Sequence, residues 1–219
     1  MKNLIPAIAR RGYQVDLLHV RNHGPYLENP PAGVNIIDLG SSHVYPSLPA
    51  VVRYLRRERP VVMLSDKDRV NRTALLARAL ARVPTRVVVS SGTTISIYLA
   101  GVGPFERWLQ RTSMGRLYPY ADRIIVTSTG VADDMSAYTG LARERIEVVA
   151  SPVVPDALLD TPQPLPDHPW FGAGQPPVIL GVGGAKRAQG LRDAAARLRP
   201  GSRPATVPAG DPGPGQTTR

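Results

Sequence analysis

Short apolar runs alternate with amphipathic stretches along the chain as far as Val149. Runs of about four to eight residues rich in Val, Ile and Leu are typical of strands that are covered on both faces. They predict strands at residues 13–20, 35–39, 61–64, 85–90, 124–126 and 146–149. Apolar positions spaced three and four apart predict helices between them, within residues 4–12, 48–59, 71–81, 105–118 and 129–139. This alternation predicts an α/β fold, a Rossmann-like doubly wound parallel sheet.

The segment Ala121–Pro155 is the clearest strand–helix–strand unit in this pattern. Gly140 follows the last helical position and can end the helix. Asp133 and Asp134 lie in the early turns, where carboxylates suit the positive end of the helix dipole. We expect a right-handed crossover between the two parallel strands of this unit.

The composition changes twice after residue 150. Residues 151–177 are rich in proline and predict an ordered interdomain linker. Residues 178–183 belong to the run PPVILGVG, which predicts the first strand of a second domain. Residues 184–219 lose almost all β-branched apolar residues and gain Arg, Ala, Pro and Gly, so they predict a disordered tail. Because this change is abrupt, we interpret the tail as a frameshifted version of an absent C-terminal domain.

The net charge of +10 suggests an anionic partner, but its distribution weakens the case for nucleic acid. Seven basic and two acidic residues lie from Gly184 onward, so half of the excess belongs to this short segment. We therefore expect an Arg-rich solvated surface with a possible peripheral contact to an anionic membrane, and nucleic acid as an unlikely partner. The chain has no cysteine, which excludes disulfides and thiolate metal sites. It also has no apolar run of membrane-spanning length and no signal-peptide core, so a cytoplasmic location is expected.

The wording of residues 121–155, ADRIIVTSTGVADDMSAYTGLARERIEVVASPVVP, resembles the end of the N-terminal domain in family 4 glycosyltransferases of the GT-B fold. In that family the run ends in an Asn-Pro-Val-like turn, whereas this chain has Ser151, Pro152 and Val153. The family also has a first strand and a Gly-rich loop before a helix like the one that opens this chain. The resemblance therefore implies a GT-B N-terminal domain, residues 1–150, that lacks its first strand and is truncated at both ends.

The resemblance implies transfer of a sugar from a nucleotide-sugar donor to an acceptor hydroxyl, as in glycan, lipid or cell-surface polysaccharide synthesis. It implies no metal requirement and no cofactor besides the donor, whose contacts in the family lie mostly in the second domain. Where many relatives have a histidine that faces the donor sugar, this chain has Gly92. We therefore expect this chain alone to be inactive, and we assign no catalytic residue.

Three loops follow predicted strands, at residues 65–68, 90–94 and 127–130. Open α/β sheets bind ligands beyond the carboxyl ends of their strands, and a helix N-terminus favours phosphate. The candidate substrate-binding residues are Ser91, Gly92, Thr93, Thr94, Ser128, Thr129 and Gly130. The other interpretation of the same residues is ordinary turn and cap chemistry.

Other motifs are weak or missing. The four histidines show no metal-ligand spacing, and the sequence contains no Walker loop or nucleophile elbow. The alternative function is a non-enzymatic α/β binding module whose basic tail engages an anionic partner.

Overall fold

The computed structural model describes residues 3–21, 27, 29–154, 158, 167–172, 174, 175 and 178. The chain divides into two compact units, residues 1–164 and 165–219. In the second unit the described part includes one short 3₁₀ turn, η4 (Pro169–Phe171). The predicted strand at 178–183 and the predicted tail at 184–219 lie outside the described residues, apart from Val178.

The first unit alternates strands and helices as the sequence predicts. Its strands are β1 (Val15–His19), β2 (Val34–Asp38), β3 (Val62–Asp66), β4 (Arg86–Ser91), β5 (Arg123–Val126) and β6 (Ile146–Val148). Its helices are α1 (Leu4–Arg10), α2 (Leu48–Glu58), α3 (Asp68–Ala81), α4 (Ile95–Leu99), α5 (Pro104–Leu117) and α6 (Thr129–Thr139). Short 3₁₀ turns are η1 (Tyr45–Ser47), η2 (Tyr118–Tyr120) and η3 (Arg143–Arg145). The short helix α4 falls partly in a stretch that the sequence pattern predicts as loop.

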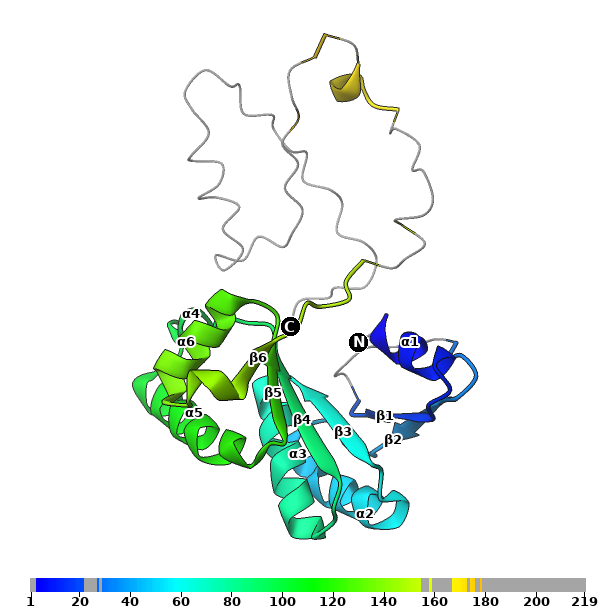
Figure 1. The fold of residues 1–219 in the computed structure, drawn as a ribbon, viewed down its shortest axis with the longest axis vertical. Helices are drawn as coiled ribbons and strands as arrows, with labels where there is room; N and C mark the ends of the chain where they lie inside the picture. The colour runs from blue at the N-terminus through cyan, green and yellow to red at the C-terminus, as the bar shows by residue number, and fades with distance from the viewer. Residues whose placement is uncertain are drawn as a thin grey trace. The chain divides into compact units, whose positions relative to one another are not determined.

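All strand pairs in the described residues are parallel, which confirms the predicted fold class. One sheet has the order β3-β4-β5-β6, and β1 and β2 form a separate pair. Figure 1 shows α4, α5 and α6 close to one another and α2 beside α3. Each strand of the larger sheet is linked to the next by at least one helix, as parallel pairing requires.

The main core lies between the larger sheet and α3, α5 and α6. Its fully buried members include Val87, Ile124, Met114 and Met135. A second, smaller cluster surrounds Leu55 of α2 and also contains side chains from β1 and β2. Burying each large aliphatic side chain contributes roughly 1.5–3 kcal/mol, so these two clusters hold the unit together.

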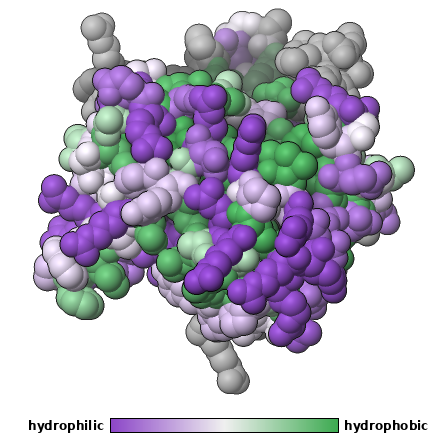
Figure 2. Space-filling model, turned by 60° about the horizontal axis from the view of Figure 1, so that its bottom comes forward, coloured by the Kyte–Doolittle hydropathy of each residue, from purple (hydrophilic) through white to green (hydrophobic). Residues whose placement is uncertain are grey.

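The predicted burial of the run 61–64 is wrong. The run 61–64 was expected to be covered on both faces, but Val61 is 81% exposed and Val62 is 50% exposed. The reason is that β3 is an edge strand of its sheet and, among the described strands, pairs only with β4. Apolar side chains also remain visible between the hydrophilic ones on the face shown in Figure 2.

Candidate functional site

The two loops that the sequence identifies at the carboxyl edge are neighbours. β4 and β5 pair in parallel, and Ser91 lies opposite Val126 in their register. The loops after these residues therefore leave the sheet side by side. A Cβ atom placed on Gly92 would lie 3.4 Å from Cγ2 of Thr127, so the two loops lie close together at this point.

The loop that holds Ser91, Gly92, Thr93 and Thr94 is open to solvent over most of its length. Ser91 is buried at the end of β4, Gly92 and Thr93 are exposed, and Thr94 is half-buried. The open positions leave backbone amides and one hydroxyl available to a polar ligand.

Asp134 of α6 closes the end of this loop. Its Oδ2 accepts from the backbone N–H groups of Ile95 (2.7 Å) and Ser96 (3.1 Å). Its Oδ1 accepts from the hydroxyl of Ser96. The carboxylate therefore satisfies the first amides of α4, the groups that a helix leaves unpaired at its start. The sequence pattern instead assigns this carboxylate to the dipole of its own helix.

The second loop, with Ser128, Thr129 and Gly130, starts helix α6. Ser128 is in extended backbone and its hydroxyl accepts from the N–H of Val131 at 3.3 Å, so it caps the helix. All three residues are exposed. Thr129 and Gly130 present a helix N-terminus to solvent, where the dipole favours an anion.

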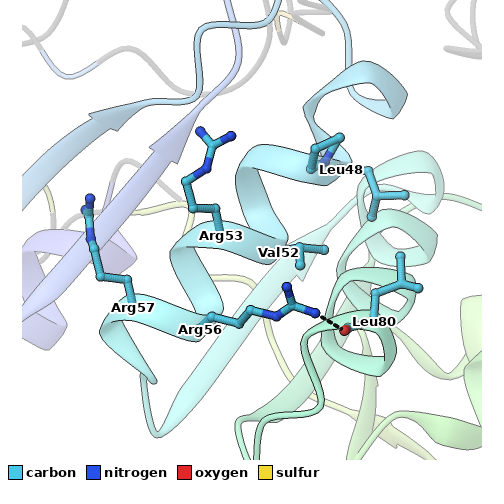
Figure 3. A pocket seen from close by; sticks show the side chains of 7 residues that line it. Leu48, Val52, Arg53, Arg56, Arg57 and Leu80 are labelled. Carbon is cyan, nitrogen blue, oxygen red and sulfur yellow. Dashed lines mark hydrogen bonds between the residues drawn. The ribbon is translucent and has the colours of Figure 1, made fainter.

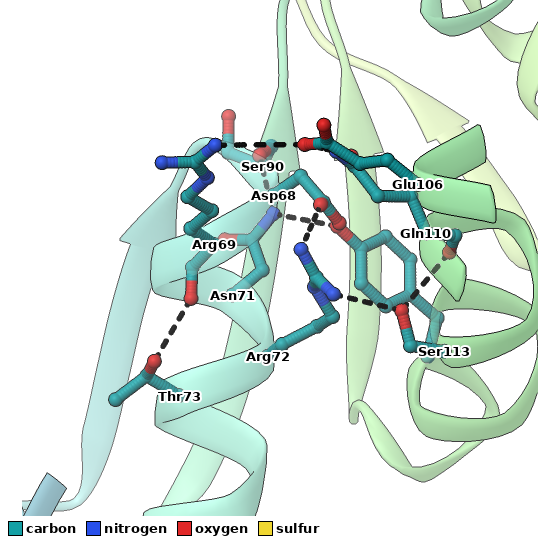
Figure 4. A network of polar contacts seen from close by, with 10 residues as sticks. Asp68, Arg69, Asn71, Arg72, Thr73, Ser90, Glu106, Gln110 and Ser113 are labelled. Atoms are coloured by element: carbon teal, nitrogen blue, oxygen red, sulfur yellow. Dashed lines mark hydrogen bonds and ion pairs between the residues drawn. The ribbon is translucent and has the colours of Figure 1, made fainter. Parts of the chain in front are cut away.

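The third loop, residues 65–68, is closed by a polar network and differs from the other two (Figure 4). Ser65 donates to Oδ1 of Asn71 at 2.8 Å. Asn71 is fully buried and donates to the carbonyl of Ser90 (2.8 Å) and to the hydroxyl of Tyr118 (3.1 Å). The hydroxyl of Tyr118 donates to Oδ1 of Asp68 at 3.1 Å.

Arg72 extends this network toward α5. Its guanidinium pairs with Oδ2 of Asp68 at 2.7 Å, donates to the hydroxyl of Ser113 at 2.9 Å, and lies 5.8 Å from the ring centre of Tyr45. Arg72 is buried, and its Nε has no hydrogen-bond partner among the described residues. Ser113 in turn donates to the carbonyl of Gln110 at 3.0 Å.

Two ionisable groups of the network are shifted by burial. Burial raises the pKa of Asp68, and the charge of Arg72 opposes this effect. Burial also raises the pKa of Tyr118, which the charge of Asp68 raises further. The phenol therefore stays protonated as a donor, and the network holds α3, η2 and α5 together. These contacts give the network a structural role.

A separate groove of about 660 Å³ lies between α2 and the end of α3 (Figure 3). Leu48, Val52 and Leu80 line its apolar part, and Arg53 and Arg57 stand on α2 beside it. Arg56 donates to the carbonyl of Leu80 at 2.9 Å. A smaller pocket of about 210 Å³ is lined by residues around Asp122 and Arg145. Neither is lined by the candidate loops.

The described residues contain no group of three His, Asp or Glu side chains placed to hold a metal ion. Within the same part of the chain, no helix is long and apolar enough to cross a membrane.

The sequence pattern missed Asn71, Arg72, Tyr118 and Asp134. Asn71 had a usable signal, because it precedes the buried Ala74 and Leu75 by three and four positions and so belongs to an apolar helix face. Arg72 had one too, because Asp68 lies four positions before it on the same helix. Tyr118 and Asp134 have no local signal, since their partners lie 38 or more residues away in the sequence.

These features define an α/β domain with a parallel sheet and open polar loops at its carboxyl edge, where domains of this class bind ligands. Residues 1–152 match the family described as glycosyl transferase 4-like domain. The chain therefore belongs to the glycosyl transferase 4-like family, as the resemblance in residues 121–155 predicts. No curated protein matches the chain. The family gives the chain a glycosyltransferase-type function, with a sugar donor and a sugar acceptor as its general partners.

Proposed function

We propose that residues 1–150 form the acceptor-side domain of an enzyme that transfers a hexose from a nucleotide-sugar to an acceptor hydroxyl. The acceptor belongs to glycan, lipid or cell-surface polysaccharide synthesis. Ser91, Gly92, Thr93, Thr94, Ser128, Thr129 and Gly130 are the residues proposed to contact it. The observation that carries this proposal is the close approach of the two open loops at Gly92 and Thr127.

We propose further that this chain alone does not catalyse transfer and needs no metal ion. Transfer requires a group that removes the proton of the acceptor hydroxyl and groups that neutralise the leaving diphosphate. The carboxylate beside the loops is that of Asp134, whose two oxygens already accept from Ile95 and Ser96. It is therefore committed to holding α4. The position of the family histidine is occupied by Gly92, which carries no proton acceptor.

Sugar binding is tested by amide NMR titration of the purified chain with methyl glycosides of glucose, mannose and galactose at millimolar concentration. We expect shifts at Gly92, Thr93 and Thr129. Gly92→Val places a branched side chain between the two loops, next to Thr127. It should weaken sugar binding about tenfold or more, equivalent to about 1.4 kcal/mol. The control is Gly101→Val, because a side chain there meets open space. Shifts confined to other regions, or equal effects of both variants, would overturn the assignment of these loops.

Catalysis is tested separately with UDP-glucose, UDP-galactose and GDP-mannose. Release of nucleoside diphosphate by the chain, above the level of a heat-treated sample, would refute the proposed inactivity. The family assignment and the proposed acceptor-binding loops would still stand.

We also propose a cytoplasmic location with peripheral contact to an anionic membrane, and no nucleic-acid partner. The net charge of +10 supports an anionic surface as partner. The alternative of a binding module with a basic tail concerns residues 184–219, which lie outside the described residues.

A further inference from the structure

Helix α5 buries some of its polar side chains and exposes its largest apolar ones. A surface helix normally turns its apolar face to the core and its polar face to water. In α5, Gln110 is buried and Ser113 is half-buried, and both belong to the polar contacts around Arg72 shown in Figure 4. Phe105 is 73% exposed and Trp108 is 60% exposed. The helix therefore uses polar groups for packing and leaves its largest apolar groups outside.

The short helix α4 also leaves large side chains exposed. Ile95 and Leu99 are buried, whereas Ile97 and Tyr98 between them are exposed. Only residues 100–103 separate α4 from α5. We call the exposed large side chains of the two helices the aromatic face. It consists of Ile97, Tyr98, Phe105, Trp108 and Leu109.

Two rings of the aromatic face contact each other, and the face does not line a groove. The rings of Phe105 and Trp108 stack with their centres 6.1 Å apart. The two pockets of about 660 Å³ and about 210 Å³ lie elsewhere, beside α2 and beside β5, and none of the residues of the aromatic face lines them. A projecting apolar surface of this kind marks an interaction site, because soluble proteins rarely expose several large apolar side chains together.

Charge identifies the kind of partner. Arg116 lies seven positions after Leu109 and eleven after Phe105, so it continues the same side of α5 and is exposed. Arg107 and Arg111 of the same helix are also exposed. Glu106 is the single acidic residue between 95 and 117, and it is engaged by Gln110 at 3.0 Å and by Arg69 at 3.7 Å. The surface thus combines aromatic rings with uncompensated positive charge.

We infer that the aromatic face docks on the surface of an anionic lipid bilayer. Trp and Tyr favour the interface between headgroups and acyl chains because their rings are apolar and carry a polar group. Phe105 and Ile97 add apolar area that enters the acyl boundary, and the arginines meet anionic headgroups. Because α4 begins directly after Thr94, docking brings the loop 91–94 next to the lipid surface. The inference rests on the proposed membrane contact and names the surface that makes it.

The test is flotation of the full 219-residue chain with vesicles of POPC alone and of POPC with POPG at about 7:3. We expect binding to the POPG vesicles and weaker binding to POPC. Phe105→Ser with Trp108→Ser should reduce binding at least tenfold. Arg116→Gln should reduce binding about fivefold on POPG vesicles alone, as expected for one basic residue near an anionic surface.

A fluorescence measurement checks that the designated ring enters the lipid. The chain has two tryptophans, so Trp170→Phe leaves Trp108 as the single reporter. Its emission should shift to the blue and become protected from aqueous quencher when POPG vesicles are added. This measurement does not depend on the folding of the serine variants.

Two control variants decide the location. Tyr120→Ser removes an exposed aromatic residue outside the aromatic face, and Leu80→Ser removes an exposed apolar residue of the groove beside α2. Both should bind vesicles as the parent does. If Leu80→Ser abolishes binding, or if the Phe105 and Trp108 double variant binds normally, the named surface is wrong while the membrane contact stands. If the parent binds no vesicles, or if the aromatic face instead mediates self-association in sedimentation, both are wrong.

Discussion

Two regions at the carboxyl edge of the sheet contain similar polar residues, but one is a buried hydrogen-bonded network and the other is exposed to solvent. The network after β3 joins Asp68, Asn71 and Tyr118 in a buried set of hydrogen bonds. The loops after β4 and β5 contain exposed Thr93, Thr129 and neighbouring amides. Both contain small polar side chains close to the end of a parallel strand.

The difference is whether the polar groups find partners within the chain. A buried polar group that lacks a partner is costly, so a buried network is closed by protein groups. An exposed polar group is hydrated and can exchange water for a ligand at little cost. Residue type alone therefore does not distinguish structural from ligand-binding polar residues. Burial and completeness of pairing do, and these can be tested by substitution.

The largest effect is expected at Arg72. Arg72→Met keeps much of the side-chain length but leaves Asp68 without its 2.7 Å ion pair in a mostly buried place. Removing one partner of a buried pair costs about 3–5 kcal/mol in unfolding free energy. The control is Arg69→Met on the same helix, whose exposed pair with Glu106 at 3.7 Å should contribute about 0–1 kcal/mol. Urea denaturation of both variants measures the difference, and equal losses would contradict a structural role for the network.

A second large effect is expected at Asp134. Its carboxylate, on α6, binds the backbone amides at the end of the open loop 91–94. Asp134→Ala leaves two backbone amides of α4 without their acceptor. We expect a loss of about 2–3 kcal/mol, since hydrogen bonds to charged groups contribute about 1.5–3 kcal/mol. The neighbouring Asp133→Ala removes an exposed pair with Arg143 and should cost about 1 kcal/mol or less. If the two variants unfold at the same urea concentration, Asp134 is free and could act as a base.

The sequence predicts most of the strands and helices. It predicts less well which polar residues are buried and paired and which are exposed. Periodicity finds the strands from β1 to β6 because each is a compact apolar run. It also finds that Gly140 ends α6, where the backbone adopts a positive φ of 78°. It does not reveal that Val61 and Val62 are exposed, because neighbours in the sheet are set by long-range pairing. It also fails for α5, where packing reverses the usual sides of the helix.

The same limit applies to the candidate residues. The loops at 91–94 and 128–130 lie close together because β4 and β5 are neighbours in the sheet, and the sequence pattern does not predict this strand order. The partner of Asp134 lies 38 or 39 residues away in the sequence, and no local pattern indicates it. Contacts of this kind depend on the crossing of α4 and α6.

The pH dependence of stability sharpens the contrast, with a smaller effect than the substitutions above. Burial raises the pKa of Asp68 above its ordinary value of 3.8. Between the unfolded and folded pKa values the folded protein keeps a proton that the unfolded chain releases, so stability falls as pH rises through this window. Below 3.8 both states are protonated and the penalty is absent. Asp68→Asn cannot ionise, so the unfolding free energy of the parent minus that of this variant should fall as pH rises above 3.8. A difference that rises with pH would contradict the prediction.

Capping by Ser128 is expected to have a moderate effect. Ser128→Ala removes the hydroxyl that accepts from Val131, and loss of an N-cap costs about 1 kcal/mol. Thr129→Ala, one position later, should change the unfolding free energy by less than about 0.5 kcal/mol. Thermal denaturation followed by circular dichroism compares the two. A larger loss for Thr129→Ala would show that Thr129 and not Ser128 starts the helix.

The smallest effect on stability is expected at Thr93, where the effect on sugar binding should be the larger one. Its side chain is exposed, so Thr93→Ala should shift the unfolding free energy by no more than about 0.5 kcal/mol. If the loop holds an acceptor hydroxyl, the lost hydrogen bond should weaken binding of the methyl glycosides by roughly 0.5–1.5 kcal/mol in the NMR titration. Thr73→Ala reverses this pattern, because Thr73 is buried and its hydroxyl donates to the carbonyl of Arg69 at 2.9 Å. It should reduce stability and leave sugar binding unchanged. If Thr93→Ala destabilises the fold as much as Thr73→Ala, or leaves binding intact, the open loop is a turn like the buried one and the contrast between the two regions fails.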